Sequence, residues 1–254
     1  GFFTLPEDGR IYRDWKEGGH GDTNLFKAIT QSSNTYFFDL AYRSDINQLN
    51  KHLSSLGFGD KACIDCFEED QVFVPEPSWK MNKHNFGWFK GDTVNMGVGQ
   101  GYLVSTPIQL AKYAYIMANK GKFSDLSLKK DLVKSEKSIE FNKFSNDDWF
   151  KLHESMVNVI EGNTGTARRL REKKNYIVAA KTGTAELVSG DNREQYSETR
   201  LDDSLRDHAL IIAFGPMPNP RYAVSVVVEN GESGGSVAGP VAISVLNSLI
   251  QEWD

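Results

Sequence analysis

The sequence predicts an α+β protein in which helices come first and an antiparallel sheet with a closing helix comes last. Over residues 22–175 the apolar residues recur mainly at helical spacing. In the second part, 176–254, two runs rich in β-branched residues, 208–214 and 222–228, are joined by a short connection that contains prolines. This arrangement favours an antiparallel hairpin. The apolar pattern over 237–253 then predicts a last helix that packs on the sheet.

Composition restricts the class of protein. With 254 residues, of which 39% are hydrophobic, the chain is long enough for one core, and we expect residues 1–254 to form a single domain. A net charge of -5, without basic runs interleaved with aromatics, argues against a general nucleic-acid binder. The apolar runs 224–228 and 241–250 are too short or too interrupted to span a bilayer. Because the chain opens without an initiator methionine, we expect it to be a fragment of a longer protein.

Two helices are predicted near the start, separated by a polar connection. The first is expected to begin after Asp22 or Thr23, either of which can cap it, and to end near Thr30. The second is expected from Thr35. The residues between them, 31–34, are Gln-Ser-Ser-Asn, whose side chains compete for backbone hydrogen bonds and so favour a break.

Further helices are predicted from their start signals and periodicity. Residues 46–56 show helical spacing, whereas 57–95 is rich in turn residues and is expected to contain little regular structure. Thr106, followed by a proline, marks the start of another helix. Ser145 with Asp148 marks the next. The segment 187–206 is hydrophilic and lacks periodicity, and we expect it to be a mobile loop.

A buried strand at 177–180 delivers a group of polar residues, Lys181, Thr182, Gly183 and Thr184. A cation and two hydroxyls surround a glycine, which leaves the backbone open to a ligand. An edge strand of this kind suits the carboxylate end of a peptide-like substrate. The alternative interpretation is a polar strand end that leads into a loop.

The two cysteines, Cys63 and Cys66, form a C-x-x-C pair. Such a pair occurs in redox motifs and in zinc sites, but no second pair is present and no βαβ pattern surrounds it. We therefore expect a structural or incidental role, and a local disulfide remains an alternative. Ser127 and Lys130 match S-x-x-K only formally, because their charged surroundings do not bury the lysine.

Two polar clusters, Ser32-Ser33-Asn34 between helices and Lys181-Thr182-Gly183 on a strand, follow the order of the last two motifs of penicillin-recognising serine enzymes. The chain resembles the transpeptidase domain of class B penicillin-binding proteins, and within them the subfamily of cell elongation, penicillin-binding protein two. The further segments that match are 12–16, 19–21, 91–93, 97–102, 106–109, 163–167, 206–208 and 229–231.

The resemblance implies a penicillin-binding protein or serine β-lactamase-like transpeptidase fold. It also implies cross-linking of peptidoglycan, in which a stem peptide acylates a serine and the amine of a second stem peptide resolves the ester. The implied partners are stem peptides, β-lactams, a glycan polymerase and the membrane proteins of an elongation complex, with no nucleic acid. The implied location is the periplasmic face of the inner membrane, where an N-terminal transmembrane helix that is not present in this chain would anchor the protein.

The resemblance also implies roles for the matched residues. Lys181, with Thr182 and Thr184, would hold the terminal carboxylate of the substrate by charge-assisted hydrogen bonds. The backbone N–H of Thr184 would form part of an oxyanion hole. Ser32 would relay a proton to or from the catalytic lysine, and Asn34 would bind the amide of the donor peptide.

The family places its nucleophilic serine and general-base lysine in an S-x-x-K motif upstream of Ser32, where this chain has none. We therefore expect the N-terminal part of the fold to be missing and this fragment to be inactive by itself. The alternatives are a D,D-carboxypeptidase, a β-lactamase-like serine hydrolase and a non-catalytic cell-wall scaffold. We expect no cofactor, because Asp14 and His20 are only weak candidates for structural zinc, which usually needs three or four protein ligands.

Overall fold

The computed structural model describes residues 1–130, 132, 135–139, 144–187 and 203–251. At its centre lies an antiparallel sheet of three strands, β5 (Ala179–Ala185), β6 (His208–Gly215) and β7 (Tyr222–Val228), in the order β5-β6-β7. Lys181 pairs with Ile212 in the β5–β6 register. In the described part of the chain β5 is therefore an edge strand, as the sequence predicts for the strand that carries Lys181.

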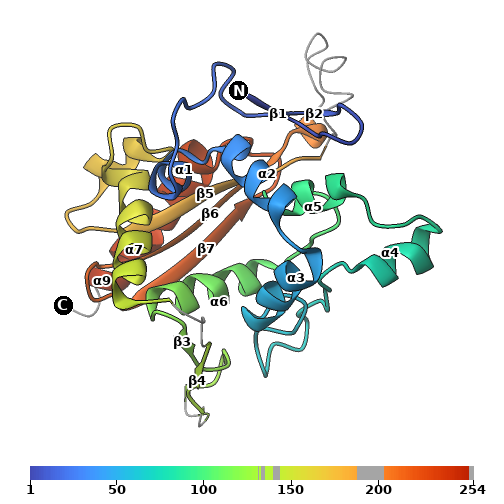
Figure 1. The fold of residues 1–254 in the computed structure, drawn as a ribbon. Coiled ribbons are helices and arrows are strands. Elements are labelled where there is room, and N and C mark those ends of the chain that lie inside the picture. The colour runs from blue at the N-terminus through green and yellow to red at the C-terminus, as the bar shows by residue number, and fades with distance from the viewer. Residues whose placement is uncertain (131, 133–134, 140–143, 188–202, 252–254) are drawn as a thin grey trace.

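Helices cover both faces of this sheet (Figure 1). Successive residues of a strand point to opposite faces, and Ala179 and Ala180 accordingly lie in two different core clusters. One cluster joins the sheet to the end of α7 (Asn146–Glu161), to η1 (Arg168–Lys173) and to α9 (Gly239–Gln251), and the other joins it to α6 (Pro107–Ala118) and α7. The elements in order are β1 (Phe2–Thr4), β2 (Ile11–Arg13), α1 (Leu25–Gln31), α2 (Asn34–Arg43), α3 (Ile46–Ser55), α4 (Pro77–His84), α5 (Lys90–Met96), α6 (Pro107–Ala118), β3 (Lys122–Phe123), β4 (Lys137–Ser138), α7 (Asn146–Glu161), η1 (Arg168–Lys173), β5, η2 (Asp203–Leu205), β6, β7, the π-helix η3 (Gly234–Ala238) and α9 (Gly239–Gln251).

The predicted α+β architecture is confirmed, and so are the two start signals of the middle helices. Thr106 caps α6 and Ser145 caps α7, and each forms a reciprocal capping box with the third residue of its helix. These helices were predictable because the capping residues and the apolar periodicity lie within one short stretch of sequence.

Several boundaries differ from the prediction. The cap of α1 is Asn24, whose side chain accepts from the Lys27 N–H, rather than Asp22 or Thr23. Ser33 caps α2, so that helix starts one residue before Thr35. The last helix is preceded by the π-helical turn η3.

The expectation of little regular structure over 57–95 is wrong, because this segment holds α4 and α5. Both are short, with few periodic apolar residues, and tertiary contacts hold them. The Lys80 ammonium of α4 reaches the Asp92 carboxylate of α5 at 2.5 Å. Of the expected loop that follows β5, residues 188–202 lie outside the described part of the chain.

Cys63 and Cys66 form a disulfide with a Cα–Cα distance of 5.3 Å, which is the local pairing left open by the sequence. The loop they close is joined to the segment after β3, since the Asp65 carboxylate accepts from the Ser127 hydroxyl at 2.8 Å. The formal S-x-x-K match at Ser127 thus belongs to this structural contact. Among the described residues, no helix has both the length and the apolar character needed to cross a membrane.

Candidate active site

Ser32 and Lys181, which are 149 residues apart in sequence, meet where the connection between α1 and α2 approaches the edge strand β5. The Lys181 ammonium donates to the Ser32 hydroxyl oxygen at 2.7 Å and to the Thr182 carbonyl oxygen at 2.8 Å. The structure therefore brings together the two polar clusters that the sequence singled out, one on the helical side and one on the strand.

The Lys181 side chain is half-buried. Burial lowers the pKa of its ammonium to about 8, because a low-dielectric environment disfavours the charged form. A lysine of this kind exchanges its proton near neutral pH more readily than an ordinary surface lysine. It can bind an anion as a cation, and it can also take part in proton transfer.

Ser32 has an unusual backbone conformation. Its φ of 55° and ψ of 50° lie in the left-handed region, which non-glycine residues seldom adopt. The Ser33 N–H bonds to the Ala28 carbonyl at 2.9 Å and the Ser32 N–H bonds to the Ile29 carbonyl at 3.3 Å. These two bonds form a Schellman motif, in which glycine is the usual residue at the position held by Ser32.

Asp14, at the end of the hairpin formed by β1 and β2, fixes the start of α2. Its buried carboxylate accepts from the Thr35 N–H at 2.9 Å, from the Thr35 hydroxyl at 3.0 Å and from the Ser33 hydroxyl at 3.3 Å. Burial alone would raise the pKa of Asp14, but the backbone hydrogen bonds from Thr35 and Lys16, the Thr35 hydroxyl and the nearby His20 together hold it below its ordinary value. An ionised Asp14 therefore anchors the residues that follow Ser32.

Asp14 and His20, the weak zinc candidates, do lie together, with the His20 Nε2 3.1 Å from an Asp14 oxygen. The other ring nitrogen of His20 lies 2.9 Å from the Gln31 side-chain oxygen. Hydrogen bonds within the protein thus occupy both groups. In the described ranges, the one cluster of three potential His, Cys, Asp or Glu ligands is Cys63, Asp65 and Cys66, whose sulfurs are joined as a disulfide.

Residues outside the two predicted clusters complete the strand side of the site. The Thr182 hydroxyl lies 2.7 Å from the Thr166 hydroxyl. The Thr184 carbonyl accepts from the Gln100 amide at 2.8 Å. The sequence placed Thr166 and Gln100 in family-like segments, but without an alignment nothing marked them as neighbours of β5. Only the fold shows that Thr166 and Gln100 contact residues of β5.

Gly183 lies beneath the first turn of η3. A Cβ on Gly234 would lie 2.2 Å from the Leu210 carbonyl oxygen and 2.7 Å from the Gly183 carbonyl oxygen. Only glycine at 234 allows η3 to approach the strands this closely. Asn34 is the first residue of α2, two positions after Ser32, which places it at the same end of that helix.

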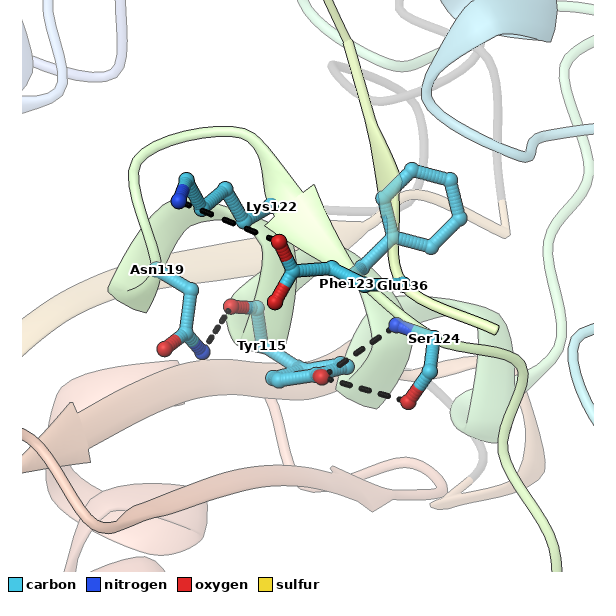
Figure 2. Close-up of a pocket in the computed structure, with 6 residues that line it drawn as sticks. All are labelled: Tyr115, Asn119, Lys122, Phe123, Ser124 and Glu136. Carbon is cyan, nitrogen blue, oxygen red and sulfur yellow. Dashed lines mark hydrogen bonds and ion pairs between the residues drawn. The ribbon is translucent and has the colours of Figure 1, made fainter. Parts of the chain in front are cut away.

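Figure 2 shows a separate hollow beside the end of α6 and strand β3. The Tyr115 hydroxyl accepts from the Ser124 N–H at 3.2 Å, and the Lys122 ammonium lies 3.8 Å from the Glu136 carboxylate. The polar groups of this hollow pair with one another. None of the predicted site residues lines it, and we assign it no role in the site.

Residues 3–247 match the family described as the penicillin binding protein transpeptidase domain. The chain belongs to this family. Among curated transpeptidase relatives, it is 36% identical to the peptidoglycan D,D-transpeptidase MrdA of Haemophilus influenzae over 99% of the chain and 40% of that protein. It is 38% identical to MrdA of Acinetobacter baumannii over 94% of the chain and 36% of that protein.

Solved transpeptidase structures agree with this membership. The fold is similar to that of Pseudomonas aeruginosa PBP2 in complex with WCK 5153, with a TM-score of 0.85 and 35% identity over 98% of this chain and 52% of that one. For Helicobacter pylori PBP2 the TM-score is 0.84, with 30% identity over 100% of this chain and 44% of that one. The predicted family and fold are confirmed, and the chain spans about 40% of the length of the first curated relative.

Proposed function

We propose that the protein to which this chain belongs is a peptidoglycan D,D-transpeptidase of the cell-elongation machinery. It cross-links stem peptides through a serine acyl-enzyme and is a target of β-lactams. The observation that carries this proposal is the 2.7 Å contact between Lys181 on the edge strand and Ser32 on the helical connection. A half-buried ammonium and a hydroxyl held in contact at an open strand edge suit both proton relay and carboxylate binding.

The other site residues have roles that follow from their places in this proposal. Thr182 and Thr184 assist Lys181 in holding the terminal carboxylate of the donor peptide, and Gly183 leaves room for the peptide backbone. The Thr184 N–H contributes to the oxyanion hole, which stabilises the charge that develops on the carbonyl oxygen. Asn34 binds the donor amide from the opposite side.

In this proposal, the nucleophilic serine belongs to a segment of the full-length protein outside this chain. A Ser-x-x-Lys segment of the full-length protein supplies the attacking serine and the lysine that accepts its proton. Ser32 then exchanges a proton with that lysine and with the leaving D-alanine amine. The protein acts on the periplasmic face of the inner membrane, anchored by a transmembrane helix.

The proposed partners are a glycan polymerase and other proteins of the elongation complex. Of two structural neighbours that are described as complexes, the one that is 31% identical to this chain supports this part of the proposal. One is described as a complex between PBP2 and MreC from Helicobacter pylori. The other is described as a peptidoglycan synthase complex that coordinates polymerisation and cross-linking, and at 24% identity it speaks only for the fold.

The full-length protein incubated with the lipid-linked disaccharide-peptide precursor and a polymerase tests this function. Transpeptidation predicts cross-linked stem peptides together with released D-alanine, and a labelled penicillin should block both. Released D-alanine without cross-links would indicate a carboxypeptidase, and opening of the β-lactam with turnover would indicate a β-lactamase. The absence of all three reactions would indicate a scaffold.

The present chain offers a simple companion experiment. Incubated alone with a labelled penicillin, it should take up no stable covalent label, because no Ser-x-x-Lys precedes Ser32. Stable labelling of the chain by itself would contradict the assignment of the nucleophile to another segment. Mass spectrometry of the labelled peptide would then identify the serine that reacted.

A further inference from the structure

Ser32 combines two features that seldom occur together. It holds the left-handed position of a Schellman motif, with φ at 55°, where glycine avoids the steric penalty of a side chain. It also carries the hydroxyl that meets Lys181 at 2.7 Å. Backbone strain of this kind persists only when surrounding contacts hold it in place. The contacts that hold Ser32 are therefore part of how the site is built.

One of these contacts comes from a residue far from Ser32 in sequence. The indole N–H of Trp15 donates to the Ser32 carbonyl oxygen at 2.8 Å and is shared with the Gln31 carbonyl oxygen at 3.2 Å. These two carbonyls lie at the end of α1, where the helix supplies no N–H partner for them. The bond thus fixes the peptide plane that follows Ser32 as well as the last turn of the helix.

Trp15 is itself held in place by its neighbours. The preceding residue, Asp14, bonds to Thr35 beyond Ser32, and the His20 ring packs edge-on against the indole with centroids 5.6 Å apart. The Trp15 residue is nevertheless 59% exposed. Burial in a core therefore explains little of its presence, whereas its directed N–H bonds explain its orientation.

We propose that Trp15 is a positioning residue for Ser32: its indole N–H holds the Ser32 peptide in the left-handed conformation that turns the hydroxyl toward Lys181. This inference rests on the proposed function, in which the contact between Ser32 and Lys181 serves proton relay. Trp15 touches neither substrate nor the reacting atoms in this role, and it acts entirely through Ser32.

Trp15→Phe in the full-length protein tests the inference, because phenylalanine keeps an aromatic ring beside His20 but has no N–H to donate. Trp88→Phe is the matched control, since the Trp88 indole also donates one hydrogen bond, to the Thr93 hydroxyl at 2.9 Å, away from the site. We expect Trp15→Phe to slow acylation by a labelled penicillin about 3- to 10-fold, as for one lost net hydrogen bond. Trp88→Phe should leave the rate unchanged.

Titration of Lys181, followed by the NMR signal of its 13C-labelled Cε, gives a readout that does not depend on activity. When Ser32 turns away, the ammonium loses an acceptor that favours its charged form, so the pKa of Lys181 should fall in Trp15→Phe. It should stay at its wild-type value in Trp88→Phe. Equal Lys181 titration in wild type and Trp15→Phe would overturn the inference, as would rate losses in both variants that simply follow their Tm values.

The two proposals fail in different ways. If the wild-type full-length protein takes no label at all, the proposed function is wrong, and the Lys181 titration still decides whether Trp15 positions Ser32. If the wild type is labelled and Trp15→Phe matches it in both rate and titration, only the positioning role is wrong.

Discussion

The two sides of the site are held by different kinds of bond. On the strand side, Lys181 lies within a regular antiparallel ladder, with residues 179–185 of β5 each paired to a residue of β6. On the helical side, Ser32 lies at an irregular junction held by the side chains of Trp15 and Asp14 together with the capping bonds of α1.

The two sides of the site therefore differ in how sensitive their backbone conformation is to side-chain substitutions. Ladder bonds join backbone groups, so the path of β5 depends little on which side chains it carries. The conformation of Ser32 depends on particular side chains far from it in sequence, and single substitutions there can reorient it. Substitutions in β5 should therefore remove a functional group and keep the backbone conformation. Substitutions at the helical junction should change the backbone conformation itself.

Lys181→Met should give the largest effect and the clearest case of lost chemistry. In the full-length protein we expect acylation by a labelled penicillin to fall about 10²- to 10³-fold, as for the loss of a charge-stabilising donor. Lys112→Met, which removes a buried lysine away from β5, is the control and should react like the wild type. Equal losses in the two variants would mean that buried lysines matter only for folding.

Lys181→Met should also change how the free energy of unfolding depends on pH. Since the folded-state pKa of Lys181 is lowered to about 8, the unfolded chain, with an ordinary lysine pKa of about 10.4, binds this proton more tightly. The lysine therefore destabilises the fold at neutral pH, and this cost is relieved as the pH rises from about 8 to about 10.4. Lys181→Met should lack that rise in the free energy of unfolding, as measured by denaturation at several pH values.

Gly234→Ala should damage the shape of the strand side from outside the ladder. The added methyl would overlap the carbonyl oxygens of Leu210 and Gly183, so η3 must move away from β5. We expect a loss of about 1–3 kcal/mol in the free energy of unfolding. Gly87→Ala is a suitable control, because a Cβ there meets nothing within 4 Å. Similar Tm values for the two variants would show that η3 yields without cost.

Asp14→Asn should lower the free energy of unfolding by a similar amount, but on the helical side and with a distinct pH dependence. Leaving its donors with a weaker acceptor should cost about 1–3 kcal/mol at neutral pH. Because the pKa of Asp14 is lowered on folding, its contribution is present above its unfolded value of about 3.9 and is lost as the pH falls below it. The Tm difference between wild type and variant should therefore narrow toward pH 3. A constant difference would mean that Asp14 acts through packing.

The elements that could be predicted from the sequence are those whose stabilising interactions are local. Ser145 with Asp148 predicts the start of α7, and Thr106 followed by a proline predicts the start of α6, because each signal lies within four residues. The helices of 57–95 were missed because their stability comes from contacts such as that between Lys80 and Asp92, which no local pattern shows.

The candidate site shows the same division. The clusters that contain Ser32 and Lys181 were identified from the sequence, and a family resemblance paired them. Their 2.7 Å contact, and the neighbours Thr166 and Gln100, required the fold. Trp15 lies in the family-like segment 12–16, but nothing in the sequence distinguishes an indole that bonds to a distant carbonyl from one that packs in a core.

The Lys181 ammonium has three N–H bonds to give. Within the described residues two of them go to the Ser32 hydroxyl and the Thr182 carbonyl, which leaves one donor for a ligand. A substrate carboxylate would therefore receive a single bond from the lysine and take its remaining donors from other groups, such as the hydroxyls of β5. The number of N–H donors on the Lys181 nitrogen thus limits how many acceptors it can bind at once. A ligand that accepts two hydrogen bonds from this nitrogen must displace either the Ser32 hydroxyl or the Thr182 carbonyl.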